Sequence, residues 1–197
     1  MVTMSLRARL AVLLAALALP LPAQARGLEA QVLAELNYAR ANPAQYADEL
    51  SQALDSGGWA LRDEDPRVVD EAIGFLLAQR PLPPLRAHAG LQAAAGAHVR
   101  AQARRGTEGH GAAAGGLAAR LKTEGVWAGL SAEAISYGYA EAREVVVQLI
   151  VDSRVPGRGH RKTIFGAGYS LAGVACGPHT RHGAMCVIDV AGALVQR

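Results

Sequence analysis

The order of the periodic segments is the feature that most constrains how this chain can fold. Apolar residues with helical spacing recur through residues 28–152, whereas two strand-like runs, 169–176 and 184–190, come late. This segregation of helices and strands favours an α+β fold over alternating β-α units. Residues 26–197 number 172, which is enough for one domain with a substantial core.

Several helix boundaries are marked by proline and glycine. Asn42-Pro43 and Asp65-Pro66 each place a capping residue before a proline, as at the start of a helix. Within segment 54–81, Asp65-Pro66 and the apolar spacing that follows predict an extra helix, which we expect at the domain edge. A helix is also expected over 140–152, although the three consecutive valines at 145–147 are compatible with a strand there. The other helices are predicted over 28–40, 44–54, 87–105 and 117–124.

The two late strands each carry one cysteine. Cys176 ends the first strand and Cys186 lies in the second, with the turn-forming segment 177–183 between them. This arrangement predicts a β-hairpin. An even pair of cysteines in an exported chain favours a disulfide over a metal site or a catalytic thiol. We therefore expect a Cys176–Cys186 bond that links the two strands.

Residues 1–25 have the three parts of a cleavable signal peptide. Arg7 and Arg9 precede the apolar run 10–19, and Ala23-Gln24-Ala25 is a small-x-small cleavage site. The run is too short to span a bilayer as a helix. We expect a secreted protein, extracellular or periplasmic, whose mature chain begins near Arg26. A buried N-terminal helix or a retained anchor is the alternative.

Charge excludes one class of function. The chain has a formal net charge of +3, and Arg7 and Arg9 supply two of these charges, so the mature part is near neutral. Nucleic-acid binding needs a clustered basic face, and the longest basic group, 158–162, is interrupted by Gly159 and His160. We expect no nucleic-acid partner, no transmembrane span after signal cleavage, and a monomer.

Two of the six histidines stand out as candidates for a functional site. His110 and His160 each lie next to glycine in segments expected to be loops, where the backbone can approach a ligand closely. His98 falls on the apolar face of a predicted helix and is expected to be a hydrogen-bonded core residue. His88, His179 and His182 are expected at the surface.

Two acids are candidates to join these histidines. Glu133 interrupts the apolar stretch 130–135, and Asp152 continues the buried face of the preceding helix. A buried carboxylate needs a partner, and histidine is a suitable one. The alternative is that both acids are solvated.

Six segments, taken in order, resemble the CAP family, which comprises the cysteine-rich secretory, antigen 5 and pathogenesis-related proteins and is also called the SCP domain. The similarity is greatest to its bacterial exported branch and spans residues 28–192. The segments are Leu36-Asn37-Tyr38-Ala39-Arg40-Ala41-Asn42-Pro43, Pro83-Pro84-Leu85, Gly109-His110-Gly111, Ala132-Glu133-Ala134-Ile135, residues 152–161 and residues 186–192.

This resemblance implies a three-layer α-β-α sandwich with a central antiparallel sheet and a cleft. The family places two histidines and two acids in that cleft, and they correspond to His110, Glu133, Asp152 and His160. The chain departs from the family pattern at two of these places. Asp152 stands where glutamate is common, and Ala132-Glu133-Ala134 replaces the usual Gly-Glu-Asn.

Three functions are compatible with these residues. The first is a secreted module that binds a small ligand, lipid or peptide, with His110 and His160 forming a weak site for zinc or another divalent ion. The second is a hydrolase such as a protease. Ser131, Ser136 and Ser153 lie near the site segments, but none is in a nucleophile-elbow motif. The third is an interaction protein with a vestigial cleft. Without a recognisable nucleophile, we assign no catalytic residue.

Overall fold

The computed structural model describes residues 27–58, 61, 64–111 and 115–195. The signal peptide predicted over 1–25 lies outside the described residues. Within the described part, no helix is long and apolar enough to cross a membrane. Its helices are α1 (Leu28–Ala41), α2 (Pro43–Asp55), α3 (Pro66–Ala78), α4 (Ala89–Arg105), α5 (Gly116–Thr123), α6 (Ala142–Val151) and α7 (Gly159–Ile164).

Four strands form one sheet in the order β1-β3-β4-β2. The central strand β4 pairs antiparallel with both β3 and β2, whereas the two-residue strand β1 pairs parallel with β3. The sheet is thus antiparallel except at this short edge. Its strands are β1 (Arg86–Ala87), β2 (Ser131–Tyr137), β3 (Leu171–His179) and β4 (Gly183–Ala191).

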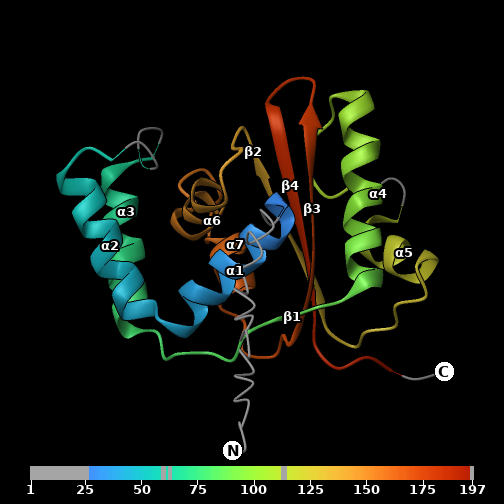
Figure 1. Cartoon of the computed structure of the whole chain (residues 1–197), viewed down its shortest axis with the longest axis horizontal. Helices are drawn as coiled ribbons and strands as arrows, with labels where there is room; N and C mark the ends of the chain where they lie inside the picture. Colours follow the sequence, from blue (N-terminus) through green and yellow to red (C-terminus); the bar gives the residue numbers. More distant parts are fainter. Residues whose placement is uncertain (1–26, 59–60, 62–63, 112–114, 196–197) are drawn as a thin grey trace, which may run out of the picture.

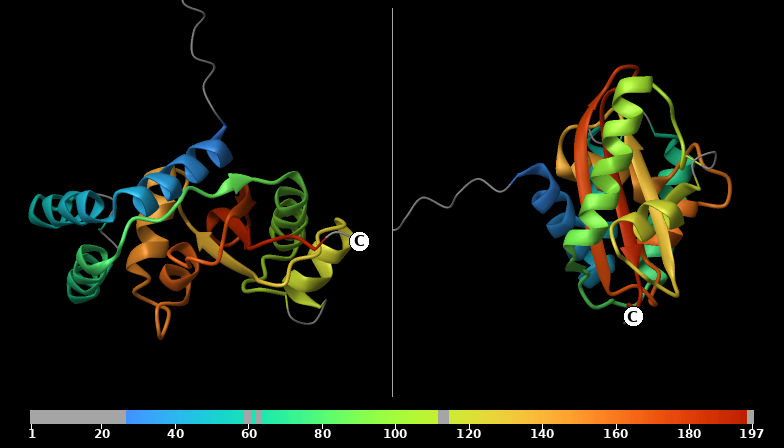
Figure 2. Two further views of the ribbon diagram at one scale, coloured as in Figure 1. Left: turned by 90° about the horizontal axis from the view of Figure 1, so that it is seen from below. Right: turned by 90° about the vertical axis from the view of Figure 1, so that its right-hand side faces the viewer.

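Helices cover both faces of the sheet, as Figures 1 and 2 show. Helices α4 and α5 lie on one face, and α1, α6 and α7 lie on the other. Helices α2 and α3 pack against each other outside this second layer, where α3 contacts α6. The α+β class and the three-layer arrangement predicted from the sequence are confirmed.

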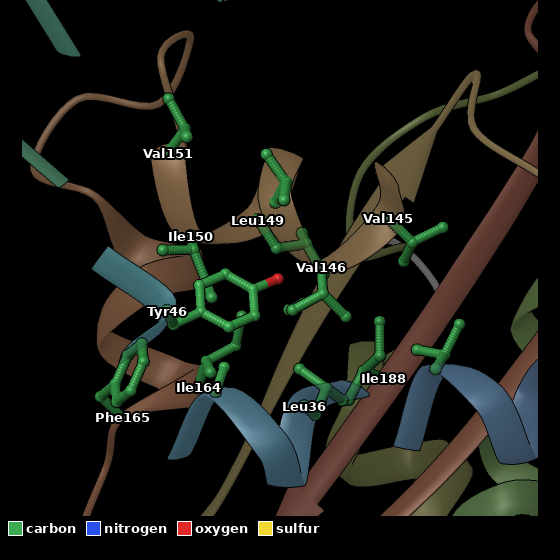
Figure 3. Close-up of a cluster of buried hydrophobic side chains, with 14 of the residues drawn as sticks. Leu36, Tyr46, Val145, Val146, Leu149, Ile150, Val151, Ile164, Phe165 and Ile188 are labelled. Atoms are coloured by element: carbon green, nitrogen blue, oxygen red, sulfur yellow. The ribbon is translucent and has the colours of Figure 1, made fainter. Parts of the chain in front are cut away.

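The main core lies between the sheet and the layer that contains α1 and α6 (Figure 3). Strand β4 supplies this core from alternate positions, because successive side chains of a strand point to opposite faces. Cys186, Ile188 and Val190 pack into it, whereas Met185 and Val187 pack on the opposite face, toward α4. Burial on both faces accounts for the nearly continuous apolar run of β4.

The hairpin of β3 and β4 carries the predicted disulfide. Cys176 and Cys186 are directly opposite in the strand register and are bonded, with their Cα atoms 4.1 Å apart. Both strands continue further than the sequence predicts, so the turn is confined to residues 180–182. Gly177 and Pro178, which were expected in the turn, belong to β3. The two strands are therefore paired closer to the turn than expected.

Besides the two-residue strand β1, two elements near the candidate site are not anticipated by the sequence pattern. Strand β2 lies in the stretch where only an apolar surrounding for Glu133 was recognised, and its residues show no strict alternation of apolar and polar side chains. Helix α7 begins at Gly159, so His160 lies in the first turn of a short helix. The prediction that His160 is in a loop is therefore wrong. Glycine at 159 only marks the start of this helix.

Candidate functional site

The first histidine of the site, His110, is paired with a buried acid. Its Nδ1 lies 2.7 Å from Oε1 of Glu133, which is on β2. The Glu133 side chain is only 2% exposed, whereas that of His110 is 56% exposed. The hydrogen bond from His110 to Glu133 raises the pKa of the imidazole. The pair thus joins a carboxylate inside the domain to a ring at its surface.

Glu133 has a second partner in Arg120, which reaches it from α5. Burial by itself would raise the pKa of the Glu133 carboxyl group. The hydrogen bond with His110 and the charge of Arg120 outweigh burial and hold this pKa below its usual value. Arg120 also donates to the backbone oxygen of His110 over 3.2 Å. Helix α5 is therefore linked to both members of the pair.

The loop that carries His110 is held at Gly109. The Gly109 N–H donates to the hydroxyl of Tyr137 over 2.9 Å, and that hydroxyl donates to Gln102 Oε1 over 2.6 Å. On the other side, the Gly109 carbonyl accepts from Gln102 and from His98 Nε2, the latter over 2.8 Å. His98 is thus a hydrogen-bonded core histidine, as predicted, and its burial lowers its pKa.

Glycine is required next to His110 for two reasons. Gly109 and Gly111 have φ angles of 84° and 68°, in the left-handed region that other residues rarely adopt. A Cβ on Gly111 would also lie 3.2 Å from the His98 ring. The glycines therefore let the loop pass closely over α4 and turn His110 toward the sheet edge.

The second histidine, His160, is paired with Asp152 at the end of α6. Asp152 Oδ1 lies 2.9 Å from His160 Nδ1, and its Oδ2 accepts from the His160 backbone N–H, also over 2.9 Å. The Asp152 side chain is fully buried and the His160 side chain is 15% exposed. Because both carboxylate oxygens bind one residue, the orientation of the imidazole is closely constrained.

A short, irregular segment, residues 152–158, joins this pair. Asp152 and Arg158 at its two ends have positive φ angles of 58° and 54°. The Arg158 guanidinium donates to the carbonyl oxygens of Asp152 and Ser153 and forms an ion pair with Glu71 of α3. These contacts stabilise a backbone conformation that is costly for residues other than glycine. Helix α3, which lies in segment 54–81, thus contacts segment 152–158.

Both histidines line the same open cavity, whose volume is about 580 Å³. Ile135 and Tyr137 of β2 form part of its wall, so the cavity follows the free edge of the sheet. Asp152 and Glu133 lie behind their histidines. The other lining residues are Glu64, Glu108, Gly109, Gly138, Tyr139, Gln148, Ser153, Arg154, Val155 and His182.

The model of the cysteine-rich secretory protein family, CAP, matches residues 33–190. The chain belongs to the CAP family. The match includes both histidine–carboxylate pairs of the cavity, which agrees with the family assignment made from the sequence segments.

Individual CAP proteins are distant from this chain. A solved extracellular protein with an SCP domain from Bacillus anthracis is 18% identical, with a TM-score of 0.48, and the match covers 57% of this chain and 35% of that one. A cysteine-rich secretory protein from Staphylococcus aureus is 14% identical, with a TM-score of 0.42 and coverages of 66% and 40%. This chain thus spans less than half of either protein. No curated protein matches it.

The donor atoms of this cavity limit how a metal ion could bind. Each histidine uses Nδ1 for its carboxylate, and neither Nε2 has a partner among the described residues. Within that part of the chain, no group of three or more histidine, cysteine, aspartate or glutamate residues could hold a metal ion. The donor set therefore fits only an ion bound weakly by one or two imidazoles and completed by water or a ligand.

Sequence reasoning missed several residues of this cavity. Tyr137 belongs to β2 and shares a face with Glu133 and Ile135, but this face mixes acidic, apolar and aromatic residues, so no alternation in the sequence marked it. Glu64 reaches the cavity from the turn before α3, where it contacts the Ser153 hydroxyl. Nothing in the local sequence indicates that contact, because residues 64 and 153 are distant along the chain.

A second prediction about the histidines, besides the loop expected at His160, is wrong. His179 was expected at the surface but is buried, because its Nε2 bonds the Thr107 carbonyl over 3.0 Å and its ring packs edge-on against Tyr137. His182 stacks on His179 and bonds Glu108 Oε1 over 2.8 Å. The hairpin turn thus supports the start of the His110 loop.

Proposed function

We propose that the mature protein acts outside the cytoplasm as a ligand-binding CAP module. The observation that carries this proposal is that His110 and His160 come from separate segments and line one cavity, each held by a buried carboxylate. Imidazoles fixed through Nδ1 leave Nε2 available to a ligand. The disulfide and the signal peptide expected over 1–25 support export.

The wall of the cavity indicates the kind of ligand. Ile135, Val155 and the ring of Tyr137 offer apolar surface, and the two imidazoles offer polar contacts. A small lipid or a peptide combines both properties. Titrating the protein with a fatty acid and with short peptides, while following the ring signals of His110 and His160 by NMR, tests this part. Shifts confined to cavity residues support it, and unchanged signals with every probe contradict it.

A weak divalent-metal site is part of the same proposal. His110 and His160 would hold zinc or a similar ion, which would supply a Lewis-acidic point for a ligand. Glu133 and Asp152 would orient the two rings and increase their basicity. The chain's own contribution is therefore to fix both rings before any ligand arrives.

Calorimetry with zinc tests the metal site. The double variant His110→Ala/His160→Ala is expected to lose the binding heat, and Glu133→Gln to weaken binding about 10- to 100-fold, because it removes the charge that orients His110. His88→Asn is the matched control, since it removes an imidazole but can keep the cap on Leu91 N–H. Equal heats for the wild type and the double variant would exclude the site.

Hydrolysis is less well supported by the geometry. Ser153 lines the cavity, but its hydroxyl contacts Glu64 and accepts from the Asp65 N–H. No hydrogen bond joins Ser131, Ser136 or Ser153 to a histidine among the described residues. A serine nucleophile needs such a base. Turnover of peptide or ester substrates that His160→Ala abolishes would overturn this preference.

A further inference from the structure

Asp189 is a buried acid whose carboxyl group has no part in the contacts described so far around the cavity. It lies on β4 directly opposite Glu133 of β2, and it is fully buried. Side chains at opposite positions of antiparallel strands lie on the same face and are close neighbours. Neither carboxyl oxygen of Asp189 receives a hydrogen bond from an N–H or O–H group of the described residues. A buried carboxylate without a donor would be very costly.

The charged groups around Asp189 do not neutralise it. Glu133 faces it from β2, and on its other side β3 contributes Gly173, which has no side chain. Arg120 of α5 forms its ion pair with Glu133, and His98 of α4 bonds Gly109. Burial, together with the negative charge of Glu133, raises the pKa of Asp189 to about 9.

We propose that Asp189 keeps a proton in the folded protein and donates a hydrogen bond through it to the Glu133 carboxylate, and that Asp189 is thereby a positioning residue for His110. This arrangement gives the buried carboxyl group a partner and avoids two facing negative charges. Each carboxylate oxygen of Glu133 has two lone pairs, so it can accept this bond in addition to those from His110 and Arg120. The inference concerns the proposed cleft but holds whether or not a ligand binds.

The protonated Asp189 has a consequence for His110. Three donors then surround the Glu133 carboxylate, from the His110 loop, from α5 and from β4, and its orientation toward His110 is determined by all three. The second pair differs, because within the described residues the hydrogen bonds of the Asp152 carboxylate all go to the backbone and ring of His160. Asp189 therefore supports the carboxylate of the His110 pair and not that of the His160 pair.

The pH dependence of stability tests the proton on Asp189. An unfolded aspartate ionises near pH 3.9, whereas this one ionises at about 9 in the folded protein. Between these values only the folded state holds the proton, so Asp189 lowers stability progressively as pH rises. Asp189→Asn keeps a donor for Glu133 and cannot ionise. From pH 5 to 8, the unfolding equilibrium constant of the wild type should rise about tenfold per pH unit relative to this variant.

The control for this comparison is Asp48→Asn, an equal loss of charge at an exposed position of α2. Its unfolding constant should stay in a nearly constant ratio to that of the wild type above pH 5. If Asp189→Asn also gives a constant ratio over this range, Asp189 is ionised in the folded protein and the proposal is wrong.

Two NMR measurements complete the test, and the first uses the wild type alone, so it remains decisive if Asp189→Asn does not fold. In the wild type, the carboxyl carbon of Asp189 should show no titration step between pH 3 and 7, and a step there would overturn the proposal. The Nδ1–H signal of His110 should persist in Asp189→Asn and be lost in Asp189→Leu. Persistence in the leucine variant would refute the positioning role. Neither result depends on zinc, so failure here is distinct from failure of the metal site.

Discussion

His110 and His160 hold the same relation to a buried carboxylate but differ in how far they are open to solvent. His110 is more than half exposed, and its partner Glu133 carries the ion pair with Arg120. His160 is largely covered, and both oxygens of Asp152 are engaged by it. Aspartate, rather than the longer glutamate common in the family, is therefore sufficient at position 152, because its carboxylate already reaches both the ring and the backbone of His160.

We predict that Glu133→Gln lowers the pKa of His110 toward its ordinary value. The hydrogen bond and charge of Glu133 raise this pKa, and glutamine supplies no charge. The stabilisation from the pair is therefore fully present below about pH 6.5 and is lost as pH rises through the raised pKa of the folded state. An NMR titration of the His110 ring measures the shift. Asp152→Asn is the control and should leave this titration unchanged.

At the scale of elements, the site depends on loops that are fastened to helices. The His110 loop is joined to α4 through His98 and Gln102, and to β2 through Tyr137. The segment after α6 is joined to α3 through Arg158. Histidine flanked by glycine was sufficient to identify the first loop, but the elements that hold it lie elsewhere in the chain.

We predict that Tyr137→Phe loosens the His110 loop and lowers the free energy of unfolding by about 1–2 kcal/mol, because the Gly109 N–H and Gln102 Oε1 each lose a partner. Hydrogen exchange of the Gly109 amide should accelerate. Tyr169→Phe is the matched control, since within the described residues Tyr169 takes part in a side-chain hydrogen bond only through its backbone oxygen. Equal exchange in both variants would show that the Tyr137 hydroxyl does not hold the loop.

At the scale of the whole molecule, Arg40 joins segments that are distant in the sequence. It is fully buried in α1, and its guanidinium donates to the carbonyl oxygens of Pro83, Gly166 and Tyr169, and to that of Ile164. Burial lowers the pKa of Arg40. All of these partners are carbonyl groups, so the arginine connects α1, the proline-rich connector and the chain after α7.

We predict that Arg40→Met lowers the free energy of unfolding by about 3–5 kcal/mol, since the buried carbonyl groups lose their donors. Chemical denaturation monitored by circular dichroism measures this loss. Arg80→Met removes an exposed arginine and should change stability by less than about 0.5 kcal/mol. A small effect at residue 40 would mean that water replaces the guanidinium.

The sequence by itself determined the features that depend on short stretches of chain. Helix spacing, proline starts and paired cysteines identified most helices, the hairpin and its disulfide, and glycine neighbours distinguished His110. Tertiary structure alone decided the rest. Strand β2 becomes recognisable only when β4 pairs with it, and Glu64, Arg120 and Asp189 reach the site by packing between distant segments. Such contacts leave no periodic pattern, because they depend on which elements lie side by side.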